Sequence, residues 1–253
     1  SAHMAGHSQF SNIMHRKGAQ DARRAKVFTK LIRELTVATR EGLPDPNANP
    51  RLRTAVTAAR AANMPKDTME RAIKRGSGDA GGAAFEQVRY EGYGPGSVAM
   101  IVDTLTDNRN RTAAAVRSAF NKFGGAMGES NTVAFQFNRI GFFRYPLDVA
   151  SEDEMMDTAV EAGADDVVTN ETGHEVTCSP DDFHTVLTGL EDKYGTPNAA
   201  ELLWRPVSTV TVGEDAATTL FKLIELLEDD DDVQSVSSNF DISDEIMEKL
   251  NAS

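Results

Sequence analysis

Residues 98–123, VAMIVDTLTDNRNRTAAAVRSAFNKF, change their hydrophobic period halfway along. Val98 to Leu105 is an apolar, β-branched run of the kind found in buried strands. From Arg109 to Phe123 the apolar residues recur three or four positions apart, which predicts an amphipathic helix. Apolar residues then alternate over 133–137, which predicts another strand. The stretch is therefore predicted to form a strand–helix–strand unit.

The same unit returns near the C-terminus, with strands predicted at 207–212 and 233–242 around a helix at 214–227. The intervening segment has its own series, βαββαβ. Its strands are predicted at 141–145, 166–169, 175–178 and 201–205, and its helices at 151–162 and 180–194. These elements predict an α+β protein in which a ferredoxin-like domain (140–206) is inserted into a split α/β sandwich (79–139 plus 207–243). Two sequential domains are the alternative topology.

An N-terminal helical domain is predicted over residues 4–78. Apolar residues follow one helix face from Ala19 to Glu41. Asn49 can cap a second helix, and Pro50 suits its first position. Met64 and Pro65 interrupt the pattern before a short third helix, and glycines near residue 78 mark the domain boundary.

Charge is distributed very unevenly along the chain. The whole sequence carries 26 Lys and Arg against 39 Asp and Glu. Residues 1–75 hold 15 cations and 6 acids, whereas residues 151–253 hold 4 cations and 26 acids. A basic end joined to an acidic remainder indicates a polyanionic partner that meets one end only. Chance clustering of solvated charges is the alternative.

The basic end contains two candidate nucleic-acid-binding features. On the first long helix, Arg23, Lys26, Lys30, Arg33 and Arg40 fall on one arc opposite the apolar face, which suits phosphate contacts or, alternatively, an ordinary solvated face. The preceding segment is a polar arm that could order on nucleic acid or simply fray. Its candidate residues are His7, His15, Arg16 and Lys17.

Two loops offer further candidate contacts. Arg109 and Arg111 lie at a predicted helix start, where free N–H groups suit a phosphate, although Asp107 or Asn108 could simply cap the helix. The glycine-rich segment 92–96 could let RNA approach the backbone, but a tight loop between strands explains its glycines better.

The sequence contains little evidence for a catalytic site, a metal site or a membrane-spanning segment. His174 and Cys178 lie too far apart along a predicted strand to share one zinc ion. No nucleophile with a base at usable spacing is found, and neither a cofactor nor a metal is predicted. The acidic run from Glu228 to Asp232 reads as a solvated turn, with a Mg²⁺ site or a contact to basic protein as the alternative. The absence of a long apolar run and the lone cysteine indicate a cytoplasmic protein.

Long blocks of sequence resemble the YebC family, which includes the mitochondrial translational activator of cytochrome c oxidase. They are MAGHS (4–8), HRK (15–17), AQDA (19–22), FTKLIRE (28–34), ANPRLR (48–53), RAANMPKD (60–67), YEGYGPG (90–96) and LTDNRNRT (105–112). This chain has Gln9 and Phe10 where the family typically has Lys and Trp, and Met14 where Lys is frequent. These differences remove positive charge and an indole from the arm.

The resemblance implies a three-domain, non-enzymatic protein of the bacterial cytosol or of mitochondria. Family members have been described as transcriptional regulators and as ribosome-associated translation factors that relieve stalling on proline-rich stretches. The expected partner is therefore the ribosome or ribosomal RNA, with DNA as the alternative. The sequence predicts no oligomeric state.

Overall fold

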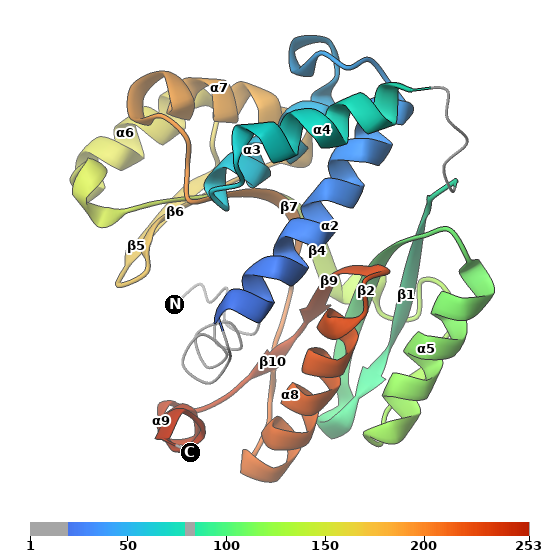
Figure 1. Cartoon of the computed structure of the whole chain (residues 1–253). Helices are drawn as coiled ribbons and strands as arrows, with labels where there is room; N and C mark the ends of the chain where they lie inside the picture. The colour runs from blue at the N-terminus through green and yellow to red at the C-terminus, as the bar shows by residue number, and fades with distance from the viewer. Residues whose placement is uncertain (1–19, 79–83, 253) are drawn as a thin grey trace. The chain divides into compact units, whose positions relative to one another are not determined.

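The computed structural model describes residues 20–78 and 84–252 (Figure 1). They form two compact units. The first contains residues 84–138 and 204–252 together with the start of helix α2 as far as Lys26, and the second contains residues 27–78 and 139–203. The α+β class is confirmed, and the division into domains at 4–78, 79–139 with 207–243, and 140–206 stays a prediction.

A four-stranded antiparallel sheet in the order β3-β1-β2-β9 forms the centre of the first unit. Its strands are β1 (Glu86–Gly94), β2 (Val98–Thr106), β3 (Ala126–Met127) and β9 (Val233–Ser238). Helices α5 (Arg109–Lys122) and α8 (Glu214–Asp229) pack on one face, as Figure 1 shows, and Ala99 and Ile101 of β2 pack against Trp204 on the other. Strand β2 is therefore buried on both faces, which accounts for its continuous apolar run.

The strand predicted at 133–137 is wrong over most of its length, because a buried glutamate binds the backbone N–H groups of this segment. Residues Ala134–Gln136 form a 3₁₀ turn, η3, and strand β4 (Phe137–Tyr145) begins only after it. The Glu91 carboxylate, 1% exposed, accepts hydrogen bonds from the backbone N–H groups of Asn131 (2.8 Å), Val133 (3.0 Å) and Ala134 (2.7 Å). Because these donors are satisfied by a side chain, the segment needs no neighbouring strand.

The hairpin between β1 and β2 confirms the tight loop predicted from its glycines. The turn Pro95–Ser97, η2, contains Gly96 at φ 79°. A Cβ on Gly92 would lie 2.5 Å from the carbonyl oxygen of Ala126 in β3. The glycines therefore serve a left-handed turn and a close approach of two strands.

The C-terminal strands are shorter than predicted. The segment predicted at 207–212 contributes only β8 (Val210–Thr211), and the one at 233–242 is divided into β9 and β10 (Phe240–Asp241). Asn239 lies at the division, where its side-chain oxygen accepts a hydrogen bond from Ala99 N–H and its carbonyl accepts one from Val210 N–H. The chain thereby passes from pairing with β2 to pairing with β8. The terminal helix α9 (Asp244–Ala252) was not predicted.

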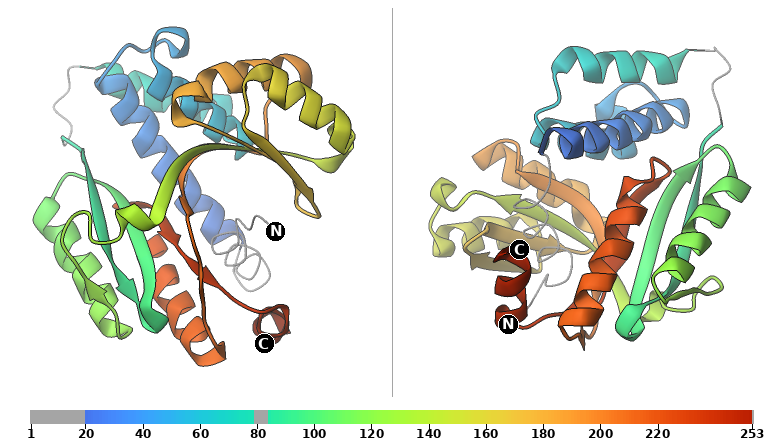
Figure 2. Two further views of the ribbon diagram at one scale, coloured as in Figure 1. Left: turned by 180° about the vertical axis from the view of Figure 1, so that it is seen from behind. Right: turned by 60° about the horizontal axis from the view of Figure 1, so that its bottom comes forward.

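The second unit contains a ferredoxin-like βαββαβ motif. Its sheet has the order β5-β6-β4-β7, with β5 (Asp166–Asn170), β6 (Gly173–Cys178) and β7 (Ala199–Pro206). Helices α6 (Glu152–Ala162) and α7 (Phe183–Tyr194) lie next to each other over one face (Figure 2). Their contact with the sheet forms a core around Phe143, Val176 and Phe183. The predicted order of helices and strands is confirmed in this segment.

Three helices contribute to the second unit: α2 (Gln20–Arg40) from residue 27 onward, α3 (Pro50–Ala61) and α4 (Lys66–Ser77), with a short 3₁₀ turn η1 (Pro46–Ala48). Asn49 caps α3 as predicted, because its side-chain oxygen accepts from Leu52 N–H at 3.1 Å. Its amide also donates to the carbonyls of Ala38 and Leu43, both at 2.8 Å. The Asn49 side chain thus accepts a hydrogen bond from a free N–H group at the start of α3 and also connects α3 to the end of α2.

Gly76 permits the contact between α4 and α2, since a Cβ there would lie 2.4 Å from the carbonyl oxygen of Thr36. In an open helix Gly→Ala stabilises by about 1 kcal/mol. Here we expect Gly76→Ala to destabilise the protein by about 1 to 2 kcal/mol, because the helices must separate. Thermal unfolding measures the change, with Gly213→Ala, which has open space around it, as the control. A raised melting temperature for Gly76→Ala would contradict the packing described.

Candidate nucleic-acid interface

The predicted contacts of the basic arm, His7, His15, Arg16 and Lys17, lie outside the described residues. On α2, Arg23, Lys26, Lys30 and Arg33 are half-buried, whereas the helical arc predicts full exposure. Lys26 donates from Nζ to the carbonyl of Asp229 (2.8 Å) and to the carboxylate of Asp231 (3.1 Å). The hydrogen bond to Asp231 raises the pKa of Lys26 despite partial desolvation. This lysine therefore already has an acidic partner.

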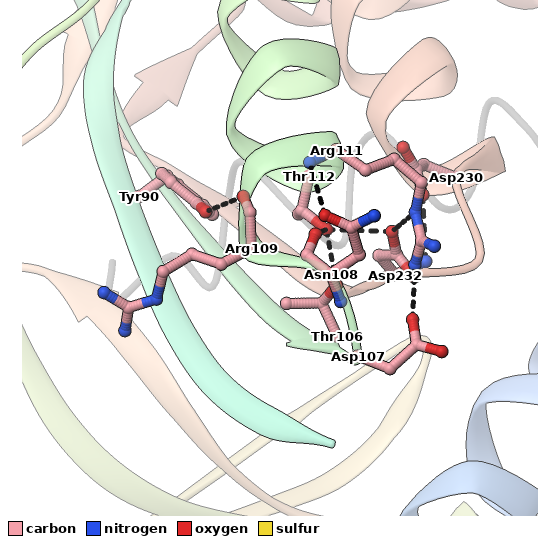
Figure 3. Close-up of polar contacts among 9 residues, drawn as sticks. All are labelled: Tyr90, Thr106, Asp107, Asn108, Arg109, Arg111, Thr112, Asp230 and Asp232. Carbon is pink, nitrogen blue, oxygen red and sulfur yellow. Dashed lines mark hydrogen bonds and ion pairs between the residues drawn. The ribbon is translucent and has the colours of Figure 1, made fainter. Parts of the chain in front are cut away.

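The start of α5 combines a helix cap with an ion-pair network, drawn in Figure 3. Asn108 is the capping residue, because its side-chain oxygen accepts from Arg111 N–H at 3.0 Å. Its own N–H donates to the hydroxyl of Thr106 (3.0 Å), which is 2.7 Å from the hydroxyl of Thr112. The capping alternative is thereby confirmed, and the end of β2 is fixed to the first turn of α5.

Arg111 is held by two carboxylates. Its Nε and Nη2 donate to the two oxygens of Asp232, at 3.0 and 2.9 Å, and Nη2 also donates to Asp107 at 2.8 Å. The hydrogen bonds to Asp107 and Asp232 raise the pKa of Arg111. A bidentate pair of this kind fixes the guanidinium plane. Arg111 consequently connects α5 to the turn between α8 and β9.

Arg109 is two residues before Arg111, but its side chain is more exposed and has a different partner. Its side chain is 62% exposed, and Nε donates to Glu86 at 3.2 Å. The two guanidinium groups extend to opposite sides in Figure 3. An exposed ion pair of this kind contributes little to stability and can be exchanged for another anion. Of the two arginines, Arg109 is the better placed for a phosphate.

The acidic run is only partly a solvated turn. Asp229 and Asp231 have exposed side chains, but Asp232 is 5% exposed. The Asp232 carbonyl accepts from Leu105 N–H at 2.8 Å, and its carboxylate accepts from the Thr112 hydroxyl at 2.8 Å. The predicted solvated turn is therefore wrong at Asp232, because that residue pairs with buried donors of β2 and α5.

His174, a residue type that serves catalysis in other proteins, has a structural role here. His174 is 1% exposed; its Nε2 donates to the carbonyl of Ala150 (2.9 Å), which leaves Nδ1 to accept from the Thr169 hydroxyl (2.8 Å). Within residues 20–78 and 84–252 no cluster of His, Cys, Asp and Glu side chains could hold a metal ion. None of the described helices is long and apolar enough to cross a membrane.

Cys178 is expected to be unreactive in the native protein. It is buried, and desolvation raises its pKa to about 11. At pH 8 roughly one thiol in a thousand is then ionised, and the thiolate is the reactive form. An aromatic disulfide reagent should therefore label the native chain very slowly and the urea-unfolded chain at the rate of free cysteine. Fast labelling without denaturant would contradict the burial of this thiol.

Sequence reasoning missed a set of exposed cations on α4. Arg71, Lys74 and Arg75 are all exposed, on the side of the helix opposite the buried Met69 and Ala72. The signal was present in the sequence, because positions i, i+3 and i+4 share one helix face.

Comparisons with known proteins assign most of the chain to one family. The model described as "TACO1/YebC protein N-terminal domain" matches residues 8–79, and the one described as "TACO1/YebC second and third domain" matches residues 85–240. The chain is also similar to the crystal structure of the conserved hypothetical protein Aq1575 from Aquifex aeolicus. The two are 46% identical with a TM-score of 0.80 over 88% of this chain and 93% of that one. The chain belongs to the TACO1/YebC family.

Proposed function

We propose that this protein is a non-enzymatic, nucleic-acid-binding regulator of gene expression. It acts on the ribosome as a translation factor that relieves stalling on proline-rich stretches. The observation that carries the proposal is the segregation of charge: 15 cations against 6 acids in residues 1–75, and 4 against 26 in residues 151–253. A polyanion such as ribosomal RNA would attract the first segment and repel the second.

The burial of two side chains of types that often serve catalysis, Cys178 and His174, supports a binding function. Cys178 is buried with a raised pKa, and both ring nitrogens of His174 are occupied by structural hydrogen bonds. Neither can act as a nucleophile or a proton carrier without local unfolding. Incubation of the pure protein with Mg²⁺ and labelled RNA or DNA tests this part, since turnover would contradict it.

Sedimentation of cell lysate through sucrose distinguishes the ribosome from DNA as the target. We expect the protein to migrate with ribosomal subunits or whole ribosomes, and to move to the top of the gradient after the lysate is treated with ribonuclease. Migration that responds to deoxyribonuclease instead would support the alternative, a DNA-binding transcriptional regulator. Migration at the top of the gradient before either treatment would contradict both.

A further inference from the structure

The exposed cations of α4 gather on the side of that helix that faces away from its core. At about 100° per residue, Arg71, Lys74 and Arg75 lie within an arc of about 100°. Met69, Ala72 and Gly76 occupy the opposite side and are buried. The Cα atoms of Arg71 and Arg75 are four residue steps apart, a rise of about 6 Å along the axis. Three positive charges therefore occupy adjacent turns of one exposed surface.

Packing against α2 fixes the rotation of α4 about its own axis. Gly76 approaches Thr36 so closely that no side chain would fit between them, and the Thr36 hydroxyl lies 3.4 Å from the carbonyl of Ala72. Ala72 is 1% exposed. Rotation of the helix would bring larger side chains into this contact. The orientation of the three cations is thus set by the core and is available before any ligand arrives.

Several other cations of the helical segment are engaged by carboxylates. Arg51 donates to Glu34 and to Glu41, both at 2.7 Å, and Lys66 lies 3.8 Å from Glu70. By contrast, Lys74 and Arg75 form no ion pair with any residue of 20–78 or 84–252, and Arg71 has a long contact to the Thr68 hydroxyl at 3.4 Å. The helix dipole favours cations in the last turn, but Arg71 lies before that turn and is not explained by it.

We infer that Arg71, Lys74 and Arg75 form a phosphodiester-binding surface, separate from the cations of α2. Lysine and arginine that are exposed, preoriented and not neutralised by carboxylates are the groups that contact the nucleic-acid backbone. The ligand is the sugar–phosphate backbone of RNA or of DNA. The inference rests on the proposed nucleic-acid-binding function and adds the surface through which it acts.

The test measures how binding depends on salt for the full chain and for the triple variant Arg71→Gln/Lys74→Gln/Arg75→Gln. Labelled single-stranded RNA and labelled duplex DNA are the probes, and the polymer bound more tightly identifies the source of the phosphates. Loss of three contacts should reduce the log–log salt slope by roughly 2 on single-stranded RNA or roughly 3 on duplex DNA. Gln forms helices well, so α4 should persist.

Two further variants control the measurement. The first, Arg117→Gln/Lys122→Gln/Lys222→Gln, removes three exposed charges from the other unit and should leave the slope unchanged. The second, Arg71→Lys/Lys74→Arg/Arg75→Lys, keeps the charges and should keep the slope. If the unaltered chain binds neither probe, the proposed function itself fails. If it binds and the α4 variant keeps the full slope, only the inferred surface is overturned.

Discussion

Replacing Glu91 by Gln is expected to lower the free energy of unfolding by about 3 kcal/mol, the largest effect of any single polar substitution considered. The carboxylate is buried and accepts three backbone N–H groups as well as Arg89 Nε at 3.2 Å. A glutamine offers one acceptor oxygen, and its amide would face the remaining donors. The segment 131–136 should therefore lose its fixed conformation.

Thermal or urea unfolding measures this loss, and a fall in melting temperature of roughly 6 to 12 °C is expected. Glu86→Gln is the matched control, because Glu86 lies on the same strand with its side chain 52% exposed and pairs with Arg109. That control should change stability by less than about 0.5 kcal/mol. Equal effects of the two substitutions would show that the buried carboxylate does not organise this segment.

Acid should destabilise the protein partly through the same residue. Burial alone would raise the pKa of Glu91, but the hydrogen bonds from Asn131, Val133 and Ala134 and the charge of Arg89 lower it below its usual value. A carboxyl with a depressed folded-state pKa stabilises the fold above the unfolded-state pKa of about 4.3 and loses that contribution as the pH falls through the folded-state value. Glu91→Gln should therefore reduce the difference in stability between neutral and acidic pH.

The second large effect is expected at Asp232, where Asn should destabilise the protein by about 2 to 3 kcal/mol. This carboxylate accepts two hydrogen bonds from Arg111 and one from the Thr112 hydroxyl. An Asn side chain has one oxygen and no charge, so the bidentate pair is lost. Glu225→Gln on the exposed side of α8 is the control, with an expected change below about 0.5 kcal/mol.

Substitutions of Arg109 and Arg111 should have different effects on the melting temperature. Arg111→Gln should lower the melting temperature, because it leaves Asp232 buried without its bidentate partner. Arg109→Gln should leave it within about 2 °C, since its ion pair with Glu86 is exposed. Loss of activity in a proline-rich translation reporter without loss of stability would assign a functional contact to Arg109. A stable Arg111→Gln variant would contradict the anchoring role of Asp232.

Local rules predicted much of the architecture. The hydrophobic period identified β2, α5 and the complete βαββαβ series, and the pair Asn49–Pro50 located the start of α3. These signals depend on residues within about a dozen positions of one another. The ferredoxin-like order of strands follows from the same series, because few topologies accommodate it.

Pairings between distant residues were beyond such rules. Nothing near Val133 indicates that its N–H will meet the carboxylate of Glu91, so its alternation with Phe135 and Phe137 was interpreted as a strand. Asp232 appeared to be one more residue of an acidic run because Arg111, its partner, lies 121 positions away. In each case a tertiary contact overrode a local pattern.

The sequence predicted which segment of the chain carries the candidate interface, but not which of its cations are exposed. The excess of cations in residues 1–75 is a property of composition alone. Which cations are available depends on packing, which half-buries the α2 residues Lys30 and Arg33 and leaves Arg71 and Lys74 of α4 exposed. The helical periodicity predicts on which face of the helix a side chain lies, but its exposure depends on which neighbouring elements pack against that face.

Photo-crosslinking of the whole 253-residue chain to RNA, followed by mass spectrometry of the crosslinked peptides, shows which part of the chain holds the nucleic acid. Crosslinked peptides should come predominantly from residues 4–78, and high salt should suppress them, because phosphate contacts by cations are salt-sensitive. Crosslinks confined to residues 84–252, with none in the helical segment, would contradict this prediction.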